Sequence, residues 1–174
     1  MNRRQIQLLL IVAAFLLPAM VALLLQTRWF HWDPQSTRNR GQLIEPVLAL
    51  GAEVTTAKVV ADGRRWSVLL RVPANCDAGC MRRVALFGRI REAQGKEKDR
   101  VQMVAWPGAP GGTDADWTPW QPTPDLAARL ALAEGAVILI DPLGNAMMRY
   151  GSDVDPTDVR KDLAHLLRWS KLGK

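Results

Sequence analysis

The chain opens with an apolar run that is long enough to cross a membrane as a helix. Residues 6–25 read IQLLLIVAAFLLPAMVALLL, and Gln7 is the only strongly polar side chain among them. Twenty helical residues rise by about 30 Å, which is the hydrocarbon thickness of a bilayer. Pro18 would kink such a helix, but membrane helices tolerate proline better than soluble ones. We therefore expect a transmembrane helix at residues 6–25, after a short cytoplasmic N-terminus at residues 1–5.

Two other interpretations of the run are a cleaved signal peptide and a buried helix of a soluble protein. A signal peptide has an apolar core of about 7–15 residues and then a small-residue cleavage site. Here the run continues through Leu25 into Gln26 with no such site, which favours an uncleaved anchor over both alternatives. Basic residues flank the run on both sides, so their count does not fix its orientation. Trp29, Phe30 and Trp32 resemble an interfacial aromatic belt.

Charge and cysteine content exclude several classes of protein. The formal net charge is +6, but no run of five or more basic residues and no aromatic-rich basic motif occurs. We therefore expect no nucleic-acid partner. Two cysteines in 174 residues cannot make a disulfide framework or a four-cysteine zinc site.

The sequence pattern of the remaining chain indicates a tether followed by one domain. Residues 26–48 are expected to be a juxtamembrane tether, and residues 49–174 a periplasmic domain. The pattern predicts strands at 54–60, 66–72, 101–106, 136–140 and 146–150, helices at 77–93 and 125–134, and a last helix with Asp155 as N-cap and Pro156 at its first position. This order, with a leading strand, is that of an α/β, thioredoxin-like domain, in which a central mixed sheet carries helices on both faces.

The segment at residues 107–124 is crowded with proline and glycine and is expected to be irregular. Its two indoles, Trp117 and Trp120, could form an aromatic contact surface for a partner. They could equally fold back onto the domain, and we favour this second interpretation.

The chemistry of the chain centres on its cysteine pair. Cys76 and Cys80 follow a hydrophobic strand and open a helix, and a spacing of four places both sulfurs on one helical face. The helix N-terminus and the charges of Arg82 and Arg83 favour thiolate over thiol, and a thiolate is both a nucleophile and a soft-metal ligand. This placement favours redox or metal chemistry over a purely structural pair. A disulfide here would put the domain in an oxidising compartment, the bacterial periplasm.

Two stretches resemble the Sco family of copper-handling, thioredoxin-like proteins of cytochrome oxidase assembly. The first runs from Lys58 to Cys80 and contains Asp62-Gly63, SVLLRV and CDAGC, and the second is ILIDPLGNAMMRYG at residues 138–151. The resemblance covers about residues 50–170 and implies a thioredoxin-like fold behind a single N-terminal membrane anchor. It also implies copper bound by the two cysteines and one histidine.

The chain departs from this family at two positions. Met81 follows Cys80 where the family normally has proline, and the position of the ligand histidine falls near Ala133, with no histidine around it. The two histidines of the chain are His31, at the membrane edge, and His165, which is interpreted as a solvated surface residue. Two thiolates alone can hold Cu(I) but make a poor Cu(II) site. Three methionines could add thioether ligands: Met81, Met147 and Met148. Core packing explains Met147 and Met148 at least as well.

The sequence thus predicts a single-pass protein of the bacterial inner membrane that assists cytochrome c oxidase assembly. In thiol–disulfide exchange with an oxidase subunit or another assembly factor, Cys76 would attack the partner and Cys80 would resolve the mixed disulfide. Alternatively, the cysteine pair would pass Cu(I) to this partner. Arg82 and Arg83 would support the thiolate. One alternative is a non-catalytic scaffold with a structural disulfide. Another is a general oxidoreductase, against which stand the missing Cys-x-x-Cys and the missing proline before Ala136.

Overall fold

A computed structural model describes residues 2–26, 39–51, 60–108 and 116–172. The chain divides into two compact units, one that ends at Arg38 and one that begins at Asn39. The first unit contains the helix α1 (Arg3–Gln26), which includes the expected span at residues 6–25. Within the described residues it is the one helix long and apolar enough to cross a membrane, and those of its side chains that the structure describes are exposed. The predicted aromatic belt and His31 lie outside the described residues.

The second unit is built on a six-stranded mixed sheet. Its strands are β1 (Gln42–Ala49), β2 (Trp66–Arg71), β3 (Val101–Trp106), β4 (Trp117–Pro119), β5 (Val137–Ile140) and β6 (Asn145–Tyr150). They lie in the order β1-β6-β5-β2-β3-β4. The pairs β2–β3 and β3–β4 are parallel, whereas β2–β5, β5–β6 and β1–β6 are antiparallel.

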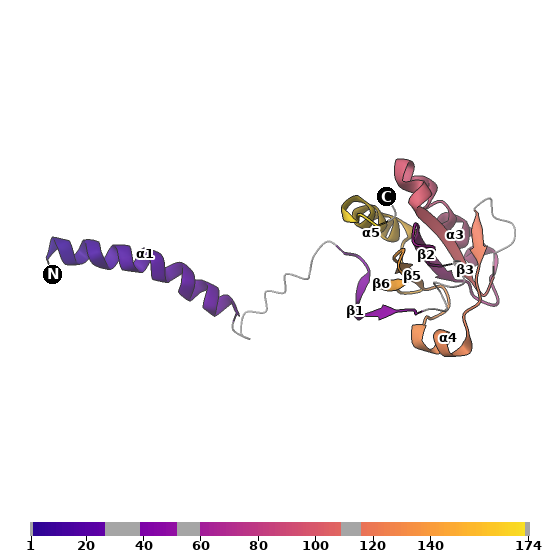
Figure 1. The fold of residues 1–174 in the computed structure, drawn as a ribbon, viewed down its shortest axis with the longest axis horizontal. Coiled ribbons are helices and arrows are strands. Elements are labelled where there is room, and N and C mark those ends of the chain that lie inside the picture. Colours follow the sequence, from indigo (N-terminus) through magenta and orange to yellow (C-terminus); the bar gives the residue numbers. More distant parts are fainter. Residues whose placement is uncertain (1, 27–38, 52–59, 109–115, 173–174) are drawn as a thin grey trace. The chain divides into compact units, whose positions relative to one another are not determined.

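Alternate residues of the central strands feed two separate cores. On one face Val68, Leu70 and Leu139 pack under α3 (Ala78–Gly88) and α5 (Pro156–Trp169). On the other face Leu69 and Ile138 pack under α4 (Pro124–Leu130). Figure 1 shows α4 on the opposite side of the sheet from α3 and α5. The expected mixed sheet with helices on both faces is therefore confirmed.

Two helices end earlier than the sequence pattern suggests. The predicted helix at residues 77–93 stops at Gly88, and a 3₁₀ segment, η1 (Glu92–Arg100), occupies the expected charged loop. The apolar periodicity continued to Ile90, which is buried, but periodicity does not report where the backbone tightens into 3₁₀ turns. The predicted helix at residues 125–134 ends at Leu130, because Ala131 adopts the left-handed conformation at φ 44°. Its N-cap is Thr123, whose side chain accepts a hydrogen bond from the Leu126 N–H at 3.3 Å.

The folded unit begins before the expected boundary at residue 49. Strand β1 begins within the predicted tether, and this corrects the extension of the tether to residue 48. Its side chains are mostly exposed, so it lacks the alternation that reveals a strand. It is held by backbone pairing with β6 and by Asp162 of α5. The buried carboxylate of Asp162 accepts hydrogen bonds from the N–H groups of Arg40 and Gly41 at 2.8 and 3.0 Å. The strand expected at residues 54–60 lies almost entirely outside the described residues.

The segment at residues 107–124 is partly regular. Residues 117–119 form β4, a short strand that pairs in parallel with β3, which corrects the expectation of an irregular segment. The indoles of Trp117 and Trp120 are buried in different cores, so they fold back onto the domain, the interpretation favoured above. Asp155 caps α5 as predicted, since its side chain accepts a hydrogen bond from the Thr157 N–H at 2.7 Å.

Candidate functional site

The two cysteines meet where β2 leads into α3. They form a disulfide with a Cα–Cα distance of 5.1 Å, and Cys80 lies in the first turn of α3. Both are half-buried and pack against the core between the sheet, α3 and α5. The structure thus brings together the two predicted cysteines at the N-terminus of α3.

An acidic residue caps the same helix. Asp77 is the N-cap of α3, and its carboxylate accepts a hydrogen bond from the Cys80 N–H at 2.8 Å. The cap satisfies one of the free N–H groups at the helix start. It also places a negative charge beside a cysteine, which opposes the thiolate-stabilising effect of the helix terminus. A signal for this was present, since aspartate directly before a helix and three residues before Cys80 is a capping pattern.

The two predicted supporting arginines differ in position. Arg82 is exposed. A Cβ placed on Gly79 would lie 3.8 Å from Arg82 Nη2 and 3.3 Å from Asp77 Oδ1, so both side chains lie beside this glycine. Arg83 is half-buried, and its Cζ lies 5.2 Å from the centroid of the Phe87 ring. The backbone N–H of Thr157 holds the pKa of Asp155 below its usual range, and the charge of Arg83 contributes to the same effect. The positive charge of Arg83 is therefore felt at Asp155, the N-cap of α5.

A small cavity adjoins the disulfide. It has a volume of about 180 Å³, and Cys80 and Arg83 form part of its wall. Pro73, Val84 and Phe87 contribute apolar surface. Its polar wall comes from loops distant in sequence: Glu134 and Gly135 lie between α4 and β5, and Ser152 follows β6. Sequence reasoning missed this cavity, because its polar wall depends on the packing of these loops against α3.

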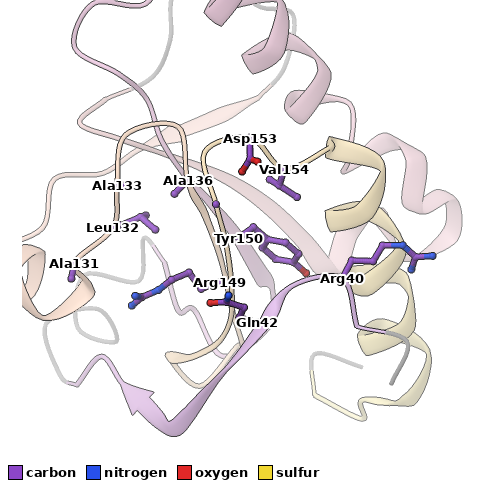
Figure 2. A pocket seen from close by; sticks show the side chains of 11 residues that line it. Arg40, Gln42, Ala131, Leu132, Ala133, Ala136, Arg149, Tyr150, Asp153 and Val154 are labelled. Carbon is purple, nitrogen blue, oxygen red and sulfur yellow. The ribbon is translucent and has the colours of Figure 1, made fainter. Parts of the chain in front are cut away.

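The place where the resemblance to the Sco family implies a histidine, near Ala133, lies at a different pocket. Ala133 contributes to a pocket of about 480 Å³, whose side chains are shown in Figure 2. The labelled residues come from the segment around β1, the loop before β5, and β6 with the turn after it. Arg40, Arg149 and Asp153 give this pocket its charges, and Ala133 has no side chain that could bind a metal.

The described residues hold no group of three or more His, Cys, Asp or Glu side chains that could bind a metal ion. Met148 is buried in the core, and Met147 packs against the same core, so packing accounts for both. His165 is exposed, as expected for a surface residue, and the centroid of its ring lies 6.3 Å from that of the Trp169 ring. The two sulfurs at the site are joined in the disulfide, and Met81 is the nearest methionine in sequence.

A mixed sheet with helices on both faces, and a cysteine pair where its first central strand meets a helix, defines a thioredoxin-like domain. Residues 66–170, more than half of the chain, match the model of the family described as "Transmembrane-like, thioredoxin-like, C-terminal domain". The chain belongs to this family. No curated protein matches it.

Two solved structures are similar to the chain at low identity. One is a SCO1/SenC family lipoprotein from Bacillus anthracis str. Ames, at 16% identity and a TM-score of 0.43, covering 64% of this chain and 84% of that one. The other is the apo form of Trgpx, at 11% identity and a TM-score of 0.45, covering 60% of this chain and 81% of that one. The family confirms the predicted thioredoxin-like fold.

Proposed function

We propose that this protein carries out thiol–disulfide exchange with a cysteine pair of a partner protein during cytochrome c oxidase assembly. The observation that carries the proposal is the Cys76–Cys80 disulfide, half-buried at the N-terminus of α3. A disulfide in this position can open to two thiols, one on Cys76 directly before the N-cap of α3 and one on Cys80 in its first turn. Partial positive charge from the helix then favours the thiolate form that exchange requires.

The reduced pair would transfer two electrons to the partner. The Cys76 thiolate attacks one sulfur of a partner disulfide, so that a mixed disulfide forms and the other partner sulfur leaves as a thiolate and takes up a proton. The Cys80 thiolate then attacks the Cys76 sulfur, which re-forms the Cys76–Cys80 bond and releases the second partner thiolate. A dithiol reductant restores the reduced pair for the next cycle.

We further propose that the reduced pair carries Cu(I) as cargo. Two thiolates at a Cα separation of 5.1 Å suit a soft ion of low coordination number. The place where the resemblance implies a third ligand, a histidine, falls near Ala133, and no histidine lies around it in the sequence. The donor set therefore does not suit Cu(II). Electron transfer and Cu(I) delivery would serve the same partner, because a copper-receiving cysteine pair must be reduced before it binds the ion.

The setting of the domain is part of the proposal. The helix α1 would anchor the chain in the bacterial inner membrane, with residues 1–5 in the cytoplasm and the thioredoxin-like domain in the periplasm. An intact disulfide supports this orientation, since disulfides persist in the periplasm and are rare in the cytosol. The partner would be an oxidase subunit or another assembly factor at the same membrane.

The reduction potential and the Cu(I) affinity of the full chain in detergent micelles test the proposal, with the Cys76→Ser/Cys80→Ser variant as control. We expect a potential above about −300 mV and Cu(I) binding that the double variant loses. A potential below that value together with no Cu(I) binding would leave only the structural disulfide of a scaffold protein.

A genetic measurement tests the assembly role separately. Deletion of the gene should lower cytochrome c oxidase activity, and the wild-type chain should restore it while the double serine variant does not. Restoration by the double serine variant would assign the protein a scaffold role instead. An unchanged oxidase activity after deletion would contradict any role in oxidase assembly.

A further inference from the structure

Arg83 has hydrogen-bonding capacity that its surroundings do not use. Among the described residues its Nε and Nη2 atoms are buried and have no hydrogen-bond partner. The guanidinium instead lies over the Phe87 ring, with Cζ 5.2 Å from the centroid. Buried polar groups are normally paired, and an unpaired charged donor carries a large desolvation cost. An acceptor that is not part of the described chain would remove this cost.

The cavity beside the disulfide is where such an acceptor would enter. Arg83 and Cys80 lie one helical turn apart on α3 and both line this cavity of about 180 Å³. The volume suits a side chain or a short peptide segment rather than a whole cofactor. The nearby carboxylate of Asp155 is already bound to the Thr157 N–H and forms no described ion pair with Arg83.

We infer that this cavity binds a carboxylate carried by the thiol or disulfide substrate, and that Arg83 is the residue that recognises it. The substrate would be a polypeptide with an acidic side chain close to its reactive cysteine. A carboxylate matches the planar donors of a guanidinium, and such charge-assisted bonds are among the strongest in proteins. The inference rests on the proposed exchange reaction for its substrate class, and it concerns selectivity rather than bond formation.

Glu134 limits which ligands fit the cavity. This exposed carboxylate lines the same cavity and repels a bare anion, but it can accept hydrogen bonds from N–H groups. A peptide segment offers both kinds of group, because its acidic side chain can face Arg83 while a backbone amide faces Glu134. Glu134→Gln removes the charge but keeps a carbonyl oxygen that can accept from this amide, so it should strengthen the binding of an acidic peptide by about twofold to threefold.

Binding is tested with exchange-inert peptides and the oxidised full chain in detergent micelles. The probes are short Gly/Ala peptides with serine in place of cysteine and one Glu within two residues of it, each compared with its Gln match. We expect the Glu peptide to bind on the order of tenfold more tightly than the Gln peptide. Arg83→Gln should abolish the difference, whereas Arg82→Gln, which changes an exposed arginine outside the cavity, should preserve it. Equal Glu-to-Gln ratios in the wild type and in Arg83→Gln would overturn the inference.

Arg83→Lys and Arg83→Met separate recognition from folding. Lysine keeps the charge but loses the planar donors, so it should retain only part of the preference for Glu. Methionine approximates the apolar part of arginine and should behave like glutamine. It repeats the test if Arg83→Gln unfolds, as reported by near-ultraviolet circular dichroism.

Exchange kinetics distinguish failure of this inference from failure of the proposed function. Reduction of the Cys76–Cys80 bond is followed with matched Glu and Gln cysteine peptides and with glutathione, which carries its own carboxylates. A Glu preference lost in Arg83→Gln supports the polypeptide substrate, and an Arg83→Gln effect confined to glutathione overturns it. Equal exchange with all thiols would refute the carboxylate site but keep the proposed function. Binding of the Glu peptide without any exchange would keep the carboxylate site but refute the proposed function.

Discussion

The carboxylate of Asp77 accepts a hydrogen bond from the backbone N–H of Cys80 at 2.8 Å. One residue therefore stabilises the start of α3 and places a negative charge at the cysteine pair. The first role favours the fold and the second disfavours a thiolate, so the two roles can be separated by a substitution that keeps the cap and removes the charge.

Asp77→Asn should make the disulfide more oxidising. Asparagine is as good an N-cap as aspartate, so the helix is kept while the repulsion of a Cys76 or Cys80 thiolate is lost. Stabilising the reduced form raises the reduction potential, and we expect a rise on the order of 10–30 mV. Equilibration of the full chain with glutathione buffers measures the shift, and alkylation of the reduced pair should be faster at neutral pH. A potential that falls or does not change would show that the Asp77 charge is not felt at the sulfurs.

The domain should stay folded when the disulfide is reduced. The bridge closes a loop of only a few residues, since Cys76 and Cys80 are four apart, and a loop this short contributes only about 2 kcal/mol. The two hydrophobic cores do not depend on it. Urea unfolding followed by tryptophan fluorescence, with and without a phosphine reductant, gives the difference. Loss of the cooperative transition on reduction would indicate a structural staple instead of a redox pair.

Asp162 should be among the most sensitive positions for stability. It is 4% exposed and accepts hydrogen bonds from the N–H groups of Arg40 and Gly41 and from the Tyr150 hydroxyl. Asp162→Ala leaves these donors without their acceptor and should lower the free energy of unfolding by about 3 kcal/mol. The matched control is Asp158→Asn, which breaks the more exposed Arg40–Asp158 ion pair and should cost less than about 1 kcal/mol. Equal losses in urea unfolding would contradict this difference.

Gly41 should not tolerate a side chain. A Cβ at this position would overlap the Tyr150 ring, so Gly41→Ala must displace either β1 or the tyrosine. We expect a loss of about 1–3 kcal/mol and faster amide exchange along the β1–β6 pairing. Gly108→Ala is the control, because among the described residues a Cβ there would meet no atom within 4 Å beyond its chain neighbours. A Gly41→Ala variant as stable as this control would refute the close contact.

Stability should fall at alkaline pH through Tyr150. Burial raises the pKa of this phenol well above its usual range, and the charge of Asp162 raises it further. In the unfolded chain the group ionises near pH 10. The contribution of the neutral phenol is therefore fully present below about pH 10 and is lost as the pH rises further, by about 1.4 kcal/mol per pH unit. Tyr150→Phe should show a flatter decline above pH 10 in urea unfolding, and parallel curves for both proteins would contradict this.

The central elements could be predicted from sequence because their local signals agree with their final environments. The buried run at residues 137–140 became β5, and the capping residues Asp155 and Pro156 mark the true start of α5. Strand β1 was missed because its side chains are mostly exposed, and β4 because proline and glycine surround it. Both lie at the edges of the sheet, where backbone pairing with a neighbour replaces the hydrophobic pattern.

The sequence alone determined the apolar helix at the N-terminus, the apolar runs that form the central strands, and a cysteine pair at the start of a helix. Each of these depends on neighbours along the chain, so a period or a spacing is enough to reveal it. Only the tertiary structure decided the strand order, the attachment of β1 through Asp162, and the cavity that joins Cys80 and Arg83 to Glu134 and Ser152. These features bring together residues far apart in sequence, and no local pattern encodes which distant loop will pack against a given helix.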